Sequence, residues 1–151
     1  MNKIVVSDNI KIENMIYEIR GKQVMLDSDL AKLYNVETKR INEAVKNNIE
    51  KFPERYCFQL NDEESNNLRS KFSTSKINSH GGRRYNQRVF TEQGVYMLAT
   101  ILKSKIAASI TIAIMDAFVV MKNIINTSLI EQKYFNELTI KNTEDIKLLQ
   151  E

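Results

Sequence analysis

A stretch of eighteen residues, DLAKLYNVETKRINEAVK from Asp29 to Lys46, constrains the fold more than any other part of the chain. It contains two amphipathic runs that are joined at an asparagine followed by a valine. A sharp turn between two helices needs one residue with a left-handed backbone, for which glycine is best and asparagine is the next choice. The stretch therefore predicts two short helices around a turn at Asn35, with Val36 filling the angle between them.

The second of these helices has a distinct inner and outer face. If Ile41, Ala44 and Val45 point inward, the helical period of 3.6 residues places a set of polar side chains on the outward face. These are Thr38 at the start of the helix, then Lys39, Asn42, Glu43 and Lys46. Lysine can donate to guanine, asparagine can pair with adenine, and glutamate can accept from cytosine. The pattern predicts a helix that reads DNA bases; the alternative is a mixed-charge face that is only solvated.

A basic segment follows later in the chain. Between Glu64 and Glu92 the sequence has no acid and six cations, namely Arg69, Lys71, Lys76, Arg83, Arg84 and Arg88. Such a segment attracts phosphate. Within it Arg83, Arg84, Tyr85 and Arg88 fall in a predicted hairpin arm, where a basic wing would contact the DNA backbone. The alternative is a solvated basic loop.

Turn and cap residues delimit the other elements. MIYEIRGKQVML predicts a β-hairpin, with Gly21 supplying the positive backbone angle at the turn. Ser28 and Asp29 offer N-caps to the first short helix, and Thr38 offers one to the second, which is expected to run to about Phe52. RYCFQL and RRYNQRVF are strand candidates, and a helix is expected to start at Asn61 or Asp62.

A second cap precedes the C-terminal helices. Thr91 is predicted to cap the helix EQGVYMLATIL, and Gly94 to permit close packing against a neighbouring element. A long amphipathic helix is expected from about Lys103 to Asn126. The predicted class is α+β, with a small N-terminal hairpin, a helix-turn-helix-like pair, a basic β-hairpin wing and a long C-terminal helix. Residues 1–126 are predicted to form one domain, and residues 127–151 a helical linker or the start of a variable C-terminal region.

The residue inventory argues against an enzyme. The chain has one histidine and one cysteine, and neither a metal-ligand cluster nor a phosphate-binding glycine loop is visible. We expect no catalytic residue, metal or cofactor. A nuclease remains an alternative among the acids, but their spacing singles out no metal site; they are Asp27, Asp29, Asp62, Glu63 and Glu64.

The hydropathy pattern predicts a cytoplasmic protein that does not enter a membrane. The first twenty residues carry acids and amides and lack the features of a signal peptide. The longest apolar run, Ile106 to Met121, is shorter than the roughly 20 residues that a membrane span requires, and it contains Asp116. We interpret that run as a buried helix.

Several strings of the sequence resemble a known family. IRGKQVMLDSDLAKLYNVETKRINEAVKNNIEKFP, then FQL, LRS, GGRRY, FTEQGVYML and IAIMDAF are similar to the ORF-six N-terminal (ORF6N) domain of phage and prophage regulatory proteins, a relative of the KilA-N domain. The resemblance runs from about Met15 to Lys122 and implies a DNA-binding module, found in some antirepressor-like proteins. Two departures are NQRV, where relatives commonly show a proline and an aromatic, and Asp116, where a basic residue is common.

Three classes of function stay open at this point. The first is a sequence-specific regulator or antirepressor module that binds double-stranded DNA. The second is an interaction module that docks a phage or host repressor or another partner. The third is an RNA-binding module, which is disfavoured because only Tyr85 and Phe90 offer stacking rings near the basic segment. The long helix carries more apolar residues than one face needs, so we expect a homodimer.

Overall fold

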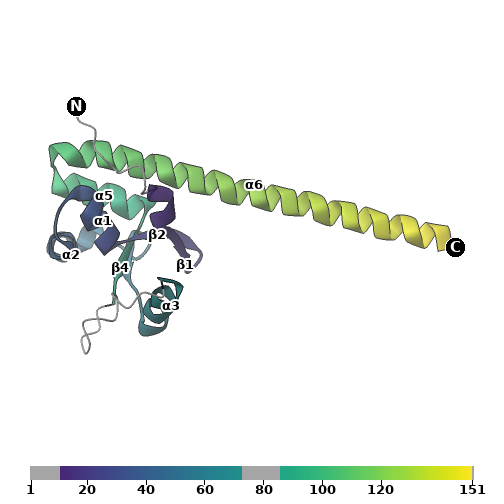
Figure 1. Ribbon diagram of the computed structural model, residues 1–151, viewed down its shortest axis with the longest axis horizontal. Coiled ribbons are helices and arrows are strands. Elements are labelled where there is room, and N and C mark those ends of the chain that lie inside the picture. The colour runs from purple at the N-terminus through teal and green to yellow at the C-terminus, as the bar shows by residue number, and fades with distance from the viewer. Residues whose placement is uncertain (1–10, 73–85, 151) are drawn as a thin grey trace. The chain divides into compact units, whose positions relative to one another are not determined.

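The computed structural model describes residues 11–72 and 86–150 (Figure 1). Its elements, in chain order, are the 3-10 helix η1 (Ile12–Met15), β1 (Ile16–Ile19), β2 (Lys22–Leu26), α1 (Asp27–Tyr34), α2 (Thr38–Asn47), the 3-10 helix η2 (Ile49–Lys51), β3 (Cys57–Gln59), α3 (Asp62–Phe72), β4 (Arg88–Thr91), α5 (Glu92–Leu102) and α6 (Lys105–Gln150). The four strands form one antiparallel sheet in the order β1-β2-β4-β3. The predicted α+β class is confirmed.

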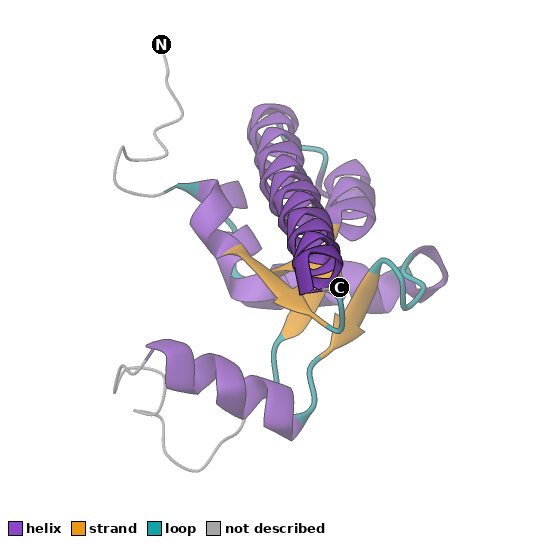
Figure 2. Ribbon diagram, turned by 90° about the vertical axis from the view of Figure 1, so that its right-hand side faces the viewer, coloured by secondary structure: helices purple, strands orange, loops and turns teal. Residues whose placement is uncertain are grey.

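The sheet is buried on both faces. On one face Val24, Leu26, Phe58 and Val89 pack in a single cluster with Leu60 and with Leu68 of α3. Side chains alternate along a strand, so Met25 and Phe90, which are partners in the register of β2 and β4, point to the opposite face. That face meets the ring of Phe52 edge-on, with ring centroids of Phe52 and Phe90 6.1 Å apart. Figure 2 shows α3 on one side of the strands.

The β1–β2 turn holds two consecutive residues in the left-handed region. Arg20 has φ 55° and Gly21 has φ 73°, which is the pattern of a type I′ hairpin turn. The sequence predicted a positive angle only at Gly21. Arginine is an unusual residue for this conformation, and its side chain explains its place there.

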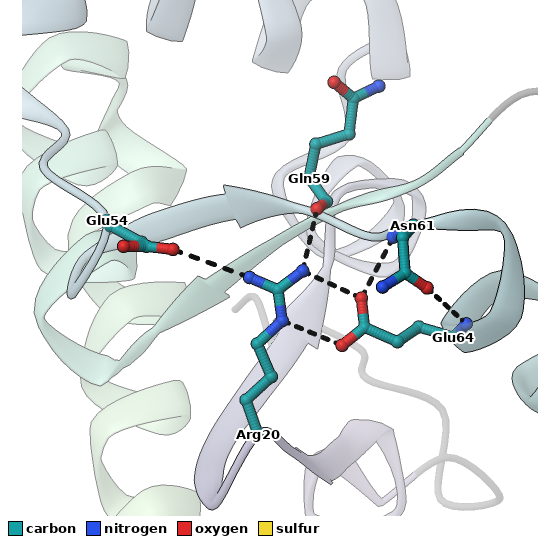
Figure 3. Close-up of polar contacts among 5 residues, drawn as sticks. All are labelled: Arg20, Glu54, Gln59, Asn61 and Glu64. Carbon is teal, nitrogen blue, oxygen red and sulfur yellow. Dashed lines mark hydrogen bonds and ion pairs between the residues drawn. The ribbon is translucent and has the colours of Figure 1, made fainter.

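The Arg20 side chain fixes the tip of this hairpin to the start of α3 (Figure 3). Its guanidinium donates two hydrogen bonds to the carboxylate of Glu64, at 2.8 and 2.9 Å, and lies 4.2 Å above the centre of the Phe58 ring. Glu64 also accepts the backbone N–H of Asn61 at 2.9 Å, and the Asn61 side chain accepts the N–H of Glu64 at 2.8 Å. This reciprocal pair is a capping box on α3. One carboxylate therefore serves both the hairpin and the helix.

This arrangement predicts an acid-sensitive contribution to stability. The hydrogen bond from Arg20 holds the pKa of Glu64 below its ordinary value of 4.5. A carboxylate with a lowered pKa in the folded state stabilises the fold above its unfolded pKa, and this contribution is lost as the pH falls through the folded value. Glu64→Gln should therefore weaken the dependence of the free energy of unfolding on pH below about 4.5. Urea titrations at several pH values, with the exposed neighbour variant Glu63→Gln as control, measure this; an equal pH dependence in both variants would contradict it.

The turn between α1 and α2 has the backbone expected of it. Asn35 adopts φ 58° and ψ 47°, and its N–H donates to Lys32 O at 3.3 Å. The N–H of Val36 donates to Ala31 O at 3.0 Å. These two bonds form a Schellman motif, which satisfies carbonyls at the end of α1. The left-handed turn at Asn35 is confirmed.

Substitutions of Asn35 should follow the cost of the left-handed backbone. Its side chain is exposed, so the change acts mainly through φ and ψ. Asn35→Gly should be neutral or stabilising, whereas Asn35→Val should lower the free energy of unfolding by about 1 to 2 kcal/mol. Thermal unfolding of both variants measures the difference. A valine variant as stable as the parent would contradict the role given to this turn.

The helix starts differ from the predicted caps. α1 begins at Asp27, before Ser28 and Asp29, and the carboxylate of Asp27 accepts the N–H of Ser28 at 2.8 Å. Thr38 is the first residue of α2 and follows Glu37 at the N-cap, where no side chain caps the helix. The N-caps are Leu26 and Glu37, so the predicted caps Ser28, Asp29 and Thr38 were wrong by one to three positions, a common error at helix ends.

The second helix is also shorter than predicted. α2 ends at Asn47 and is followed by the 3-10 helix η2, so a continuous helix to Phe52 is wrong. The amide of Asn48 donates to Ala44 O at 2.9 Å, and the backbone of Asn48 leaves the helical region with φ −136°. Asparagine side chains that bond to a helix carbonyl compete with the backbone in this way. The helix therefore stops before the 3-10 turn.

The contacts divide the chain into two compact units, Met1–Phe118 and Val119–Glu151. In the first unit, α6 has a buried stripe made by Ala107, Ile110, Thr111, Ile114, Ala117 and Phe118. The hydroxyl groups of Tyr34 and Thr111 lie 2.7 Å apart within it. Among the described residues, one helix, Lys105–Lys141, is long and apolar enough to cross a membrane by length and composition alone. The buried stripe accounts for part of that apolar character, as in the core helix of a domain.

In the second unit, the described residues belong to α6, which ends at Gln150. The side chains of this unit are exposed through Lys141 with few exceptions, and the exposed apolar ones include Val119, Val120, Ile124, Leu129, Ile130, Tyr134, Phe135, Leu138 and Ile140. The predicted division of the chain at residue 126 stays a prediction.

Candidate nucleic-acid interface

Helix α2 has one buried face and one exposed face. Ile41, Ala44 and Val45 are at most 1 % exposed, as the sequence predicted. Lys39, Glu43 and Lys46 are exposed on the other side. The inward and outward assignment is thus confirmed for these six residues. Burial of three apolar side chains holds the polar face at a defined orientation on the surface of the first unit.

Two further residues of α2 are exposed and were missed from the sequence. These are Arg40 and Asn47. Arg40, Glu43 and Asn47 follow the spacing i, i+3 and i+7 of neighbours on one helix face, so the helical period could have identified them. With Arg40 included, the exposed face of α2 carries three cations, Lys39, Arg40 and Lys46, against the single acid Glu43.

Asn42 lies at the edge of this face and is half-buried. Its amide donates to the carboxylate Oδ2 of Asp27 at 3.0 Å and to Thr38 O at 3.2 Å. Its Oδ1 accepts a hydrogen bond from Nε of Arg88 at 2.9 Å. Both ends of the amide are therefore engaged within the protein. Thr38 is half-buried as well, so neither residue shares the full exposure of Lys39 and Lys46.

Arg88 is the first residue of β4, a strand that lies between β2 and β3. Alternation along the strand puts its side chain on the same face as Phe90, the face toward α2. One of its terminal nitrogens lies 3.9 Å from the sulfur of Cys57, and its backbone N–H donates to Asp27 at 3.3 Å. Arg88 is thus half-buried between the sheet and α2. The sequence had placed it in a predicted hairpin arm, as part of a basic wing that contacts the DNA backbone.

The carboxylate of Asp27 connects these groups. It is 0 % exposed and accepts from the N–H of Ser28, the amide of Asn42 and the N–H of Arg88. The sequence singled out Asp27 only among the acids of an alternative nuclease. In the described part of the chain, no group of three or more histidine, cysteine, aspartate or glutamate residues could hold a metal ion.

Cys57 borders the same cluster and is a buried free thiol. Burial raises its pKa to about 11, against a smaller opposing effect of Arg88. A thiol with a raised pKa is a poor nucleophile at neutral pH.

The remaining predicted site residues belong to the basic wing. Arg83, Arg84 and Tyr85 lie outside the described residues, so their contacts stay predictions. The strands that flank the segment, β3 and β4, pair antiparallel, with Phe58 opposite Val89. Because α3 lies between these strands in the sequence, their connection is longer than a tight hairpin.

Thr91 and Gly94 have the structural roles that the sequence predicted. Thr91 Oγ1 accepts the N–H of Gly94 at 3.3 Å, which caps α5, and donates to Arg55 O at 2.9 Å. A Cβ atom at Gly94 would overlap the backbone carbonyl of Tyr56. The cap and the close packing are both confirmed. They position β4 and α5 rather than a reacting group.

Part of the chain matches a known protein family. A family model described as the ORF6N domain matches residues 14–101, which is more than half of the chain. This span contains α1, α2, the sheet and the Asp27–Asn42–Arg88 cluster. Neither the curated proteins nor the solved structures contain a match.

Proposed function

Because the chain belongs to the ORF6N domain family, a family of phage-type regulatory modules rather than of enzymes, we propose that it binds double-stranded DNA sequence-specifically through the exposed face of α2. In this proposal it acts in the cytoplasm as a transcriptional regulator or as an antirepressor module, without catalysis. The observation that carries the proposal is the cationic, rigidly supported outer face of α2.

The chemistry of this face suits a DNA groove. Lys39, Arg40 and Lys46 supply positive charge for phosphates, and lysine and arginine also donate to guanine. Glu43 can accept from cytosine, and Asn47 can pair with adenine. Buried Ile41, Ala44 and Val45 on the opposite side restrict how α2 can tilt. A recognition helix needs this combination of exposed polar groups on a fixed backbone.

Selection of bound sequences from a random duplex pool tests the proposal. A shared motif among the recovered duplexes would support sequence-specific binding, and uniform weak recovery would contradict it. The selected duplex and a scrambled duplex can then be titrated at several salt concentrations. This second step separates contacts to phosphates from contacts to bases.

Counterion release gives the expected size of the salt effect. If Lys39, Arg40, Lys46 and Arg88 make about four phosphate contacts, affinity should fall roughly 150-fold between about 50 and 200 mM salt. Lys39→Ala or Arg40→Ala should lower the slope by about one unit where the side chain contacts phosphate, or lower discrimination where it contacts a base. Lys22→Ala, which removes an exposed cation from the β1–β2 hairpin, is the matched control. If the DNA affinity of the parent protein hardly changed with salt concentration, the proposal would be contradicted.

A second candidate function is supported by the exposed apolar side chains of the second unit. An exposed apolar surface of this kind marks protein interaction sites in many proteins. In this alternative the module docks a repressor or another partner, or a second copy of itself, and DNA binding is absent or incidental. Failure to recover any preferred duplex, together with a flat salt response, would favour it.

A further inference from the structure

The strongest unassigned feature of the first unit is the orientation of the Arg88 guanidinium. Nε donates to Asn42 Oδ1 at 2.9 Å, and a terminal nitrogen lies 3.9 Å from Cys57 Sγ. A guanidinium has five N–H donors in a rigid planar fork. Among the described residues, the other terminal donors of Arg88 have no protein acceptor, and the side chain is half-buried rather than fully covered.

Asn42 is what fixes that plane. Its Nδ2 donates to the buried carboxylate of Asp27, so the amide oxygen must be the atom that faces Arg88. Asp27 in turn accepts the backbone N–H of Arg88 at 3.3 Å. The carboxylate therefore orients the amide and also anchors the strand that carries the guanidinium. Both amide atoms of Asn42 are used in this chain of bonds.

We propose that Asn42 is a positioning residue for Arg88, and that Arg88 binds a DNA phosphate with its remaining terminal donors. This inference rests on the proposed function. An arginine fork held in one plane suits phosphate oxygens, because little rotational freedom is then lost on binding. A half-buried side chain that starts in the sheet reaches less far than exposed Lys39, so the backbone phosphates are favoured over base edges.

The proposal changes the role expected for Asn42. An outward asparagine on a recognition helix would pair with adenine and govern discrimination between sequences. An asparagine that holds Arg88 would instead govern a sequence-independent contact. Replacing Asn42 should therefore lower the affinity for the specific and the scrambled duplex by similar factors. It should also lower the slope of log affinity against log salt concentration.

The positioning step can be tested in the free protein. In ¹⁵N-edited NMR spectra, the Nε–H of Arg88 should exchange slowly with water and should lose that protection in Asn42→Ala. The Nε–H of Arg20, which donates to Glu64 at 2.8 Å, is an internal control that should not change. An unchanged Arg88 signal in Asn42→Ala would overturn the positioning role, whether or not the protein binds DNA.

The phosphate contact is tested by a double-mutant cycle on duplex DNA. Arg88→Gln should weaken binding roughly ten-fold on both duplexes and lower the salt slope by about 0.9. In the parent protein, Asn42→Ala should lower the affinity for DNA several-fold. In the Arg88→Gln variant, the same substitution should change the affinity by less than about two-fold. Arg88→Lys keeps the charge and the backbone N–H to Asp27 while removing the Nε donor, so it should also make the protein insensitive to Asn42→Ala.

The outcomes separate this inference from the function on which it rests. If Asn42→Ala lowered the affinity for DNA equally in the parent and in the Arg88 variants, Asn42 would act independently of Arg88. A loss confined to the specific duplex would assign Asn42 to base reading. Either result would overturn the inference while leaving DNA binding intact. Absence of salt-dependent binding by the parent would instead refute the proposed function, and the NMR result would still decide the positioning role.

Discussion

Replacing Gly94 by alanine should lower the free energy of unfolding by about 3 kcal/mol or more. In an ordinary helix the same change stabilises by up to about 1 kcal/mol, because alanine has the higher helix propensity. Here the added Cβ would overlap the backbone carbonyl oxygen of Tyr56 and lie 2.8 Å from its carbonyl carbon. Neither atom belongs to a flexible side chain, so backbone must move. Overpacking of this kind typically costs about 1 to 3 kcal/mol and sometimes more.

The contacts around Tyr56 increase the expected loss. Its carbonyl accepts the backbone N–H of Thr91 at 3.0 Å and the Thr91 hydroxyl at 3.2 Å. Thr91 ends β4 and caps α5 through Gly94. Moving the Tyr56 carbonyl therefore weakens the junction of strand and helix as well as relieving the overlap.

Urea denaturation of Gly94→Ala measures this prediction. Gly21→Ala is the matched control, because its Cβ would meet nothing within 4 Å and only its φ of 73° opposes the change. We expect Gly21→Ala to lower the free energy of unfolding by about 1 to 2 kcal/mol. If Gly94→Ala proved as stable as the parent, the close approach of α5 to Tyr56 would be wrong.

The second large effect is expected at Asp27. Truncation to alanine removes the acceptor of three hydrogen bonds, at 2.8, 3.0 and 3.3 Å, from a site that is 0 % exposed. Donors left without an acceptor in a buried site lose their solvation as well as their bond. Since each buried donor left unsatisfied costs about 1 to 3 kcal/mol, the expected loss is about 3 kcal/mol or more.

Two variants sharpen the test at Asp27. Asp27→Asn keeps the shape of the side chain but turns one acceptor into a donor that faces the other donors, so it should lose about 1 to 3 kcal/mol. Asp116→Ala, at an exposed position of α6, should change the free energy of unfolding by less than about 0.5 kcal/mol. Chemical denaturation measures all three variants. A harmless Asp27→Ala would contradict the central role of this carboxylate.

Local features of the fold were predictable because their causes lie within a few residues. The turn at Asn35 follows from the preference of asparagine for the left-handed backbone, and the inner face of α2 follows from the helical period. The cap at Thr91 has the same local origin, since its bond to Gly94 spans three residues. The boundaries of α2 were harder, because the Asn48 amide ended the helix before Phe52.

The order of the strands could not be derived from these local signals. β3 and β4 were both expected, but pairing β4 with β2 places it inside the sheet. Hydrogen bonding between strands that are distant in sequence depends on the packing of the whole unit, and alternation within one strand does not specify its neighbours. As a result Arg88 was predicted in a basic hairpin wing and is found half-buried beside α2.

The sequence by itself determined the two-helix turn, the polar face of α2 and the resemblance to the ORF6N domain family, because each depends on residues that are adjacent or regularly spaced in the chain. Only the tertiary structure decided what Asn42 and Arg88 contact. Their hydrogen bond joins residues 46 positions apart, and Asp27 meets Arg88 across 61 positions. From the sequence, an asparagine amide on a helix could bond either to a DNA base or to a buried protein group. Which of the two it bonds to depends on the groups that the fold brings within about 3 Å of it.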